Sequence, residues 1–323
     1  MADPLHARFV VVIGKGGVGK TTVSACLALR AARAGKRVLV AMCNVRERLS
    51  YALEVEPIGA SNQTVLPGIE AVNMTPDKAL EEYGLMVLKL RSLYKLIFEN
   101  RLVTGFLRAT PGLDAWAMLG KAQYHVAETD HTGRRRYDTV ILDAPATGHG
   151  VDMLRVPRVI LEVASPGLLR TEAERAWALL SDPKQAALCL VTLPEDMPTN
   201  EALELDQRVR TDLGLGTSCV VINRVLPPLF SPEQRDFVLG AMSSLDADSP
   251  LAGIARASRT RARWELLQQR CIAQLSAIPA PRIELPNLFV PEVRRPALMR
   301  LAELFDPPAP GPADAAAPGS MAC

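Results

Sequence analysis

The segment Gly14–Thr21 combines four glycines with two lysines and a threonine at a spacing suited to phosphate chemistry. Glycines let successive backbone N–H groups converge on a phosphate without a clash from a Cβ atom. The segment satisfies the pattern G-x-x-x-x-G-K-[ST], in which the lysine reaches the β- and γ-phosphates of a nucleotide and the hydroxyl binds Mg²⁺. We therefore predict that Lys20 binds phosphate and that Thr21 binds Mg²⁺. The predicted nucleotide-binding residues of this loop are Gly16, Gly17, Val18, Gly19, Lys20, Thr21 and Thr22.

The flanking sequence supplies the two elements that such a loop requires. Residues Arg8–Ile13 form a β-branched, apolar run typical of a buried strand. Residues Lys20–Arg33 are rich in Ala and Leu, as is typical of a helix, and Gly35 is its expected stop. A loop between a strand and a helix holds the phosphate at the helix N-terminus, where backbone N–H groups and a partial positive charge favour anions.

Strand-like runs continue to alternate with helical patterns along the chain. Continuous apolar strands separated by helices are typical of a parallel sheet with helices on both faces. We therefore predict an α/β fold with a mostly parallel sheet flanked by helices, and with the phosphate loop at the carboxyl end of the first strand. The further predicted strands are Arg37–Cys43, Ile69–Met74, Tyr137–Leu142, Ala187–Leu193, Ser218–Ile222 and Pro281–Leu285, and two of the predicted helices are Thr199–Leu213 and Pro291–Phe305. The stretch before Ile69, which contains Pro57, Gly59, Pro67 and Gly68, is predicted to be a loop.

Two stretches interrupt this alternation. Residues 77–130 carry apolar residues three to four positions apart from Leu80 to Ile97, which indicates one face of a helix, and residues 151–181 are also mostly helical. We predict a helical insertion within a single domain of residues 1–305. The apolar face fits ordinary helix packing, the more common case, or a groove for a protein client. Residues 306–323 are rich in Pro and Ala and are predicted to be disordered.

The composition narrows the range of functions. Lys and Arg total 37 against 35 Asp and Glu, and the formal net charge of +2 argues against a general nucleic-acid-binding protein. No apolar run approaches the ~20 residues needed to span a bilayer, and the N-terminal residues do not resemble a secretory signal. The six cysteines form no CxxC pair and are expected to be reduced thiols, which favours a cytoplasmic protein without zinc.

Four segments together resemble the ArsA/Get-type ATPases, a family that includes arsenite-pump ATPases and the ATPase that targets tail-anchored proteins. The segments are GKGGVGKTT, LDAPATGHG, VVINR and PEVRRPALMRL, in the order typical of the family. Its members are P-loop NTPases with a deviant Walker A motif, marked by a second lysine at the position of Lys15. The resemblance implies that Lys15 is catalytic and reaches across a face-to-face dimer to the partner's nucleotide; otherwise it is a solvated loop lysine. It also implies ATP or ADP with Mg²⁺ as cofactors.

The resemblance assigns residues outside the loop as well. Asp143 matches the aspartate that opens switch II and meets Mg²⁺, usually through water, and Thr147, Gly148 and His149 match the positions that follow. His149 fits equally well as a simple helix cap. Asn223 matches the asparagine that reads the adenine edge, a role suited to an amide because it offers both a donor and an acceptor. The residues implied on the other side of the base are Pro291 and Val293.

This chain departs from the family pattern at two places, one in switch I and one at the zinc site of the eukaryotic members. In switch I the family has D-P-A-H, whose aspartate positions the attacking water; here Asn44 takes that place and Val45-Arg46-Glu47 follow. A neutral amide is a very poor base, so we expect weak hydrolysis by this chain alone unless Glu47 substitutes. The eukaryotic targeting members bind zinc between subunits through a CxxC ahead of A-R-W, but the corresponding positions here are Ala257 and Thr260, so no zinc is expected.

Three functions fit these observations. The first is a nucleotide-dependent switch, a homodimer or heterodimer that closes on ATP and acts on a protein client. The second is a non-hydrolysing regulatory subunit that pairs with an active ArsA-like paralogue, which Asn44 favours. The third is a partition or septum-site ATPase, which shares Lys15, although LDAPATGHG and the helical stretch after Pro76 argue against it. An arsenite-binding role is not expected, because the arsenite-binding cysteines of the pump ATPases have no secure counterparts.

Overall fold

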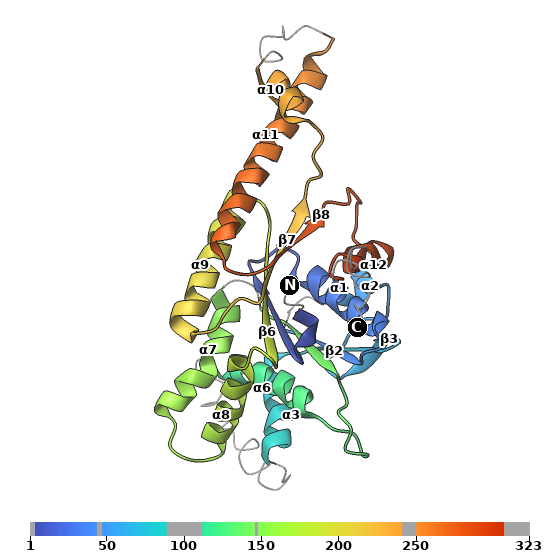
Figure 1. Cartoon of the computed structure of the whole chain (residues 1–323). Coiled ribbons are helices and arrows are strands. Elements are labelled where there is room, and N and C mark those ends of the chain that lie inside the picture. The colour runs from blue at the N-terminus through green and yellow to red at the C-terminus, as the bar shows by residue number, and fades with distance from the viewer. Residues whose placement is uncertain (1–3, 44–46, 89–111, 146–147, 241–249, 307–323) are drawn as a thin grey trace, which may run out of the picture.

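The computed structural model of the chain describes residues 4–43, 47–88, 112–145, 148–240 and 250–306. Within these residues, eight strands form one sheet in the order β3-β4-β2-β5-β1-β6-β7-β8 (Figure 1). All neighbouring strands run parallel except β3 and β4, and the predicted mostly parallel α/β architecture is confirmed. The strands are β1 Phe9–Gly14, β2 Val38–Met42, β3 Gln63–Leu66, β4 Ile69–Asn73, β5 Thr139–Asp143, β6 Ala186–Thr192, β7 Cys219–Val225 and β8 Arg282–Pro286.

Helices cover both faces of this sheet (Figure 1). The helices α1, α2 and α12 contribute to the apolar cluster on one face, and α3, α6, α7, α8 and α9 contribute to the cluster on the other. The helices are α1 Lys20–Arg33, α2 Leu49–Leu53, α3 Pro76–Leu88, α6 Leu113–Ala127, α7 Gly148–Val163, α8 Leu168–Ser181, α9 Asp196–Leu213, α10 Pro232–Gly240, α11 Ala252–Gln274 and α12 Arg295–Glu303, with short 3-10 helices η1 Pro4–His6 and η3 Leu275–Ala277. In the part of the chain that the structure describes, no helix has the length and apolar character needed to cross a membrane.

Strand β1 lies inside the sheet, between β5 and β6, and all of its residues are buried. Val10 and Val12 belong to the cluster beneath α1, whereas Phe9, Val11 and Ile13 belong to the cluster on the opposite face. This division follows from the alternation of side chains along a strand. Because both faces are covered, every position of the strand favours an apolar residue, which explains the continuous apolar run in the sequence.

The loop predicted before Ile69 is wrong over Gln63–Leu66, which form the edge strand β3. This strand turns back at Pro67-Gly68 and pairs antiparallel with β4. Gly68 has a φ of 78°, in the left-handed region that glycine favours. The residues of β3 are partly buried or exposed, so the strand lacks the apolar pattern that revealed the others. Helix α12 also begins later than predicted, at Arg295 rather than Pro291.

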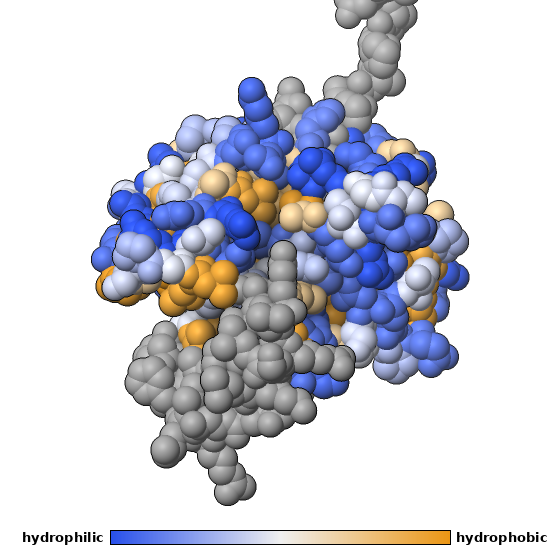
Figure 2. All heavy atoms as spheres, turned by 90° about the horizontal axis from the view of Figure 1, so that it is seen from below, coloured by the Kyte–Doolittle hydropathy of each residue, from blue (hydrophilic) through white to orange (hydrophobic). Residues whose placement is uncertain are grey.

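Within the predicted insertion, helices α3 and α6 pack against each other. The rings of Tyr83 and Trp116 meet edge to face with centroids 5.9 Å apart, and Leu80 packs against the core. For Leu80 and Tyr83 the apolar face is therefore ordinary helix packing, while Leu90, Tyr94 and Ile97 lie outside the described residues, as does the tail at 307–323. Seen from below the view of Figure 1, the described surface is mostly polar and carries a few apolar patches (Figure 2). The division into a core domain and an insertion stays a prediction.

Helices α10 and α11 form an arm that extends beyond the sheet (Figure 1). The base of the arm is fixed to the loop that follows β7. Gln268 donates to Leu226 O at 3.0 Å and accepts from Leu226 N at 2.7 Å, and the Glu265 carboxylate accepts from Leu229 N at 2.9 Å. Glu265 and Gln268 are both buried, so α11 is joined firmly to this loop.

Candidate functional site

The loop between β1 and α1 takes a backbone path that requires glycine at two positions. Gly14 and Gly19 have φ values of 149° and 99°, which L side chains rarely adopt. A Cβ on Gly14 would lie 2.2 Å from Val191 O, and one on Gly19 would lie 2.2 Å from Asn223 Nδ2. The loop is thus packed closely against the ends of β6 and β7, and it opens at the N-terminus of α1, where free N–H groups favour a phosphate.

The Lys20 side chain lies inside this loop. Its Nζ donates to the carbonyl oxygens of Gly14 and Lys15, each at 3.0 Å. Lys20 is buried, and burial lowers the pKa of its ammonium while the Asp143 carboxylate partly offsets that change. Both acceptors are neutral carbonyls. A phosphate oxygen is a stronger acceptor because it is charged, so the Lys20 ammonium is suited to exchange a carbonyl for a phosphate.

Thr21 and Asp143 meet at the carboxyl edge of the sheet. Thr21 Oγ1 donates to Asp143 Oδ2 at 2.6 Å, although the two residues are far apart in sequence. The contact forms because α1 follows β1 and Asp143 ends β5, the neighbouring strand. A hydroxyl and a carboxylate are hard oxygen donors of the kind that Mg²⁺ takes together with waters and phosphate oxygens. The pair therefore fits the predicted Mg²⁺ site, while Thr21 as a direct ligand and Asp143 as a partner of a Mg²⁺-bound water stay predictions.

A metal site built from several protein ligands is a different kind of site. Among the described residues, no group of three or more His, Cys, Asp or Glu side chains could hold a metal ion. The two positions that match zinc-binding cysteines, Ala257 and Thr260, lie one turn apart on α11. Neither side chain is a zinc ligand.

Lys15 lies on the outer side of the loop and contacts helix α9 of its own chain. Its Nζ is 2.5 Å from Glu201 Oε1 and 2.7 Å from Met197 Sδ. Neither Glu201 nor Met197 is predicted from the sequence. Their spacing of four positions places them on one helix face, but only the adjacency of β1 and β6 brings that face to the loop.

Asn223 is buried at the end of β7 and uses its amide within the fold. Its Nδ2 donates to Val18 O at 2.9 Å, and its Oδ1 accepts from Arg224 N at 2.9 Å. The structure thus brings Asn223 to the phosphate loop, while its role toward adenine stays a prediction. Pro291 and Val293 lie in the loop between β8 and α12, and Val293 packs against the cluster that contains α1.

Arg294 ties the loop that carries Pro291 and Val293 to helix α2. Its guanidinium lies 3.3 Å from the centroid of the Tyr51 ring, and it bonds to Tyr51 O and to the Glu292 carboxylate. A hydrogen bond from Tyr51 to Glu292 completes the cluster and lowers the pKa of that carboxyl.

Several predicted switch residues lie outside the described part of the chain. These include Asn44 and Thr147, and the side chain of His149 is likewise not described, although Gly148 and His149 begin α7. Glu47 is described, and its carboxylate accepts from Ser50 N at 2.7 Å and from Ser50 Oγ. In this arrangement Glu47 holds the first turn of α2, and its role in place of an aspartate stays a prediction.

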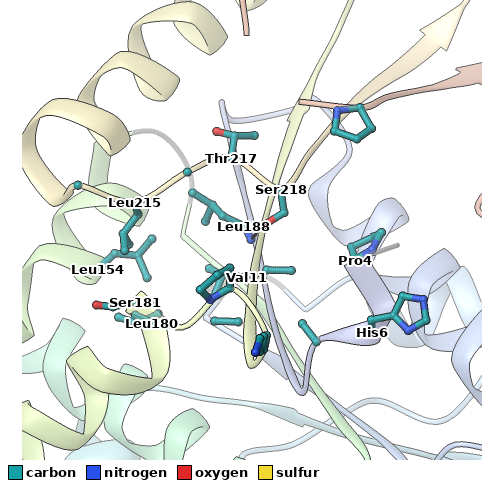
Figure 3. Close-up of a pocket in the computed structure, with 18 of the residues that line it drawn as sticks. Pro4, His6, Val11, Leu154, Leu180, Ser181, Leu188, Leu215, Thr217 and Ser218 are labelled. Atoms are coloured by element: carbon teal, nitrogen blue, oxygen red, sulfur yellow. Dashed lines mark hydrogen bonds between the residues drawn. The ribbon is translucent and has the colours of Figure 1, made fainter. Parts of the chain in front are cut away.

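A hollow of about 620 Å³ lies at the opposite edge of the sheet, near the amino ends of β6 and β7. In Figure 3, Leu154, Leu180 and Leu215 line one side of it, and Pro4 and His6 lie on the other. Thr217 Oγ1 donates to Asp206, and Ser218 Oγ accepts from Leu188 N. Because the walls are mainly apolar and these hydroxyls serve the fold, the hollow does not resemble the predicted phosphate site at Gly14–Thr21.

Comparisons with known proteins agree with this geometry. The profile of the family described as anion-transporting ATPase matches residues 7–165, which include β1, the loop and β5. The ATPase BagA of Mycobacterium tuberculosis is 29% identical over 307 residues, covering 87% of each chain. The arsenical pump-driving ATPase of Escherichia coli is 27% identical over 235 residues, 68% of this chain and 40% of that protein.

A third relative is the ATPase ASNA1 homolog 1 of Paramecium tetraurelia, 29% identical over 154 residues, 47% of this chain and 44% of that protein. The matches to proteins named ATPase thus cover between 47% and 87% of this chain. Together with the four sequence segments and the arrangement of Lys20, Thr21 and Asp143, these matches support an ArsA/Get-type ATPase.

Proposed function

We propose that the chain binds Mg-ATP at Gly14–Thr21 and works as a nucleotide-dependent switch that closes as a dimer. The observation that carries this proposal is the 2.6 Å contact of Thr21 with Asp143 beside the Lys20 ammonium. A cation, a hydroxyl and a carboxylate at one sheet edge are what a triphosphate and its Mg²⁺ require. Loops that contact a γ-phosphate change conformation when it leaves, which makes the site suitable for switching.

The hydrolytic step is proposed to be slow in the isolated protein. In-line attack on the γ-phosphate needs a water held opposite the leaving group. Asn44 stands where the family has an aspartate, and an amide orients a water without carrying the charge that would help it accept a proton. Glu47, the nearest carboxylate along the chain, is bonded to Ser50.

Asn44 also supports a second candidate, a regulatory subunit that binds ATP and pairs with an active paralogue. In both cases the chain acts on a protein partner in the cytoplasm. The described cysteines are all free thiols, which is typical of a reducing compartment. ATP turnover by the isolated chain distinguishes the two, because the switch hydrolyses ATP slowly, whereas the regulatory subunit does not hydrolyse it and leaves turnover to the paralogue.

The binding proposal is tested by thermal unfolding with and without millimolar Mg-ATP. A ligand at about 100 times its dissociation constant stabilises the folded state by ~2.7 kcal/mol. We expect Lys20→Ala to lose most of this stabilisation, because it removes the buried cation of the phosphate site. Lys184→Ala removes an exposed lysine at the amino end of β6 and is the matched control. The same shift in all three proteins would show that ATP binds elsewhere.

A further inference from the structure

The position of Lys15 is set by a residue from a distant part of the chain. Lys15 Nζ lies 2.5 Å from Glu201 Oε1, and their side chains are 24% and 35% exposed. Met197, one turn before Glu201 on α9, places its sulfur 2.7 Å from the same ammonium. Lys15 is thus held against its own chain and does not extend freely into solvent.

The chemistry of this contact makes it replaceable. A lysine ammonium is a single point charge, and a phosphate that approaches it also meets the negative charge of Glu201, so the two anions compete for the ammonium. Ion pairs with this degree of exposure change an equilibrium constant by about twofold to fivefold. The contact is strong enough to orient Lys15 and weak enough for a phosphate to displace it.

We infer that Glu201 is a positioning residue for Lys15: it holds the ammonium within its own chain, and the phosphate of a nucleotide bound to a second subunit must displace it when the dimer closes. The inference rests on the proposed function, in which Lys15 acts in trans. It goes beyond that function by naming the contact that competes with closure. Glu201 therefore sets how readily ATP drives association.

The first test is sedimentation of the full chain with Mg-ATP. Glu201→Gln keeps the size of the side chain and removes its charge, so we expect association to strengthen about twofold to fivefold. Glu204→Gln removes a charge from an exposed position on the same helix and should leave association unchanged. In a Lys15→Ala background, Glu201→Gln should have no effect, because the ammonium that it releases is absent.

A second test reads the contact itself. A water-soluble carbodiimide condenses a carboxylate with an adjacent amine into an amide, and the reagent takes up the released water to become a urea. We expect a Lys15–Glu201 amide in peptide maps of the wild type without nucleotide, and none in Glu201→Gln. Mg-ATP should lower its yield at protein concentrations at which the dimer forms.

The outcomes are distinguishable. If ATP drives association in the wild type but Glu201→Gln strengthens it equally with and without Lys15, Glu201 acts through general charge and the inference is wrong. An undiminished cross-link in the ATP dimer overturns it as well. If ATP causes no association of the wild type, alone or with its paralogue, the dimeric part of the proposed function fails, and the inference fails with it.

Discussion

The two edges of the central sheet are both rich in charge, but they use it differently. At the carboxyl edge, the Lys20 ammonium is held by two neutral backbone carbonyls at 3.0 Å. At the amino edge, Arg37 meets both carboxylate oxygens of Asp138, at 3.1 and 3.0 Å. Nearby, Arg136 bonds to Glu70 at 2.9 Å and to Glu128 at 3.0 Å.

This difference separates a binding edge from a structural edge. A guanidinium that makes two bonds to a carboxylate has a partner matched in charge and geometry, and an incoming anion gains little by displacing it. An ammonium on carbonyl oxygens gains a charged partner when a phosphate arrives. The neutral partners of Lys20 thus distinguish it from Arg37, and they mark Lys20 as the cation whose partners a phosphate most readily replaces.

The largest expected effect concerns the switch I aspartate of the family, which is replaced by Asn44 in this chain. Asn44 comes two residues after the end of β2 in the sequence, and positioned proton-transfer groups are worth about 10²–10⁴-fold in rate. We expect Asn44→Asp to raise single-turnover hydrolysis by roughly 10²-fold over a slow wild type. Glu47→Gln is the companion variant. Fast wild-type hydrolysis that Glu47→Gln abolishes would instead assign the role to Glu47.

The next effect concerns the Mg²⁺ side of the same edge. Asp143→Asn keeps an oxygen near Thr21 but removes the negative charge, and loss of an outer ligand partner typically costs roughly 10–100-fold in metal affinity. We expect a loss of this size, measured by titrating Mg²⁺ into the ATP complex and following thermal unfolding. Asp152→Asn removes an exposed carboxylate that pairs with Arg208, in a contact between α7 and α9, and serves as control. An unchanged Mg²⁺ midpoint in Asp143→Asn would contradict the assignment.

At the amino edge, a charge change should affect stability and leave binding intact. The Arg37 and Asp138 side chains are 34% and 38% exposed, so solvent screening limits the pair to about 1 kcal/mol. We expect Asp138→Asn to lower the free energy of unfolding in denaturant by about that amount, while the Mg-ATP shift stays at its wild-type value. A loss of the ATP shift would mean that the two edges are coupled.

The smallest effect is a pH dependence of that same pair. The hydrogen bond from Arg37 is the main reason why the pKa of Asp138 lies below its ordinary value of 3.8. A carboxyl with a depressed folded-state pKa adds stability above its unfolded pKa, and this stability is lost as pH falls through the folded value. The difference between wild type and Asp138→Asn should therefore be full at pH 6 and shrink below pH 3.8. Denaturant unfolding at pH 6 and pH 3 measures it, and a constant difference would refute the cause.

The sequence predicts well those features that depend on residues close to one another along the chain. The Gly14–Thr21 pattern, the apolar strand before it and the helix after it are local, and so are the seven parallel strands. Strand β3 was missed because an exposed edge strand needs no apolar pattern. The Lys15–Glu201 and Arg37–Asp138 contacts join residues 186 and 101 positions apart, and only the strand order brings them together.

The joint between α11 and the loop after β7 has a mechanical consequence. Helix α11 has 23 residues, which corresponds to a rod of about 34 Å. Its base is bonded to Leu226 and Leu229, a few residues beyond Asn223, which itself bonds to the phosphate loop. From Gln268 in that joint to Ala252 at the far end is a distance of 16 residues, or about 24 Å, so a tilt of about 5° at the joint displaces the far end by ~2 Å. The arm in Figure 1 therefore has the geometry of a lever, in which a small rotation at the joint moves the far end by a larger distance.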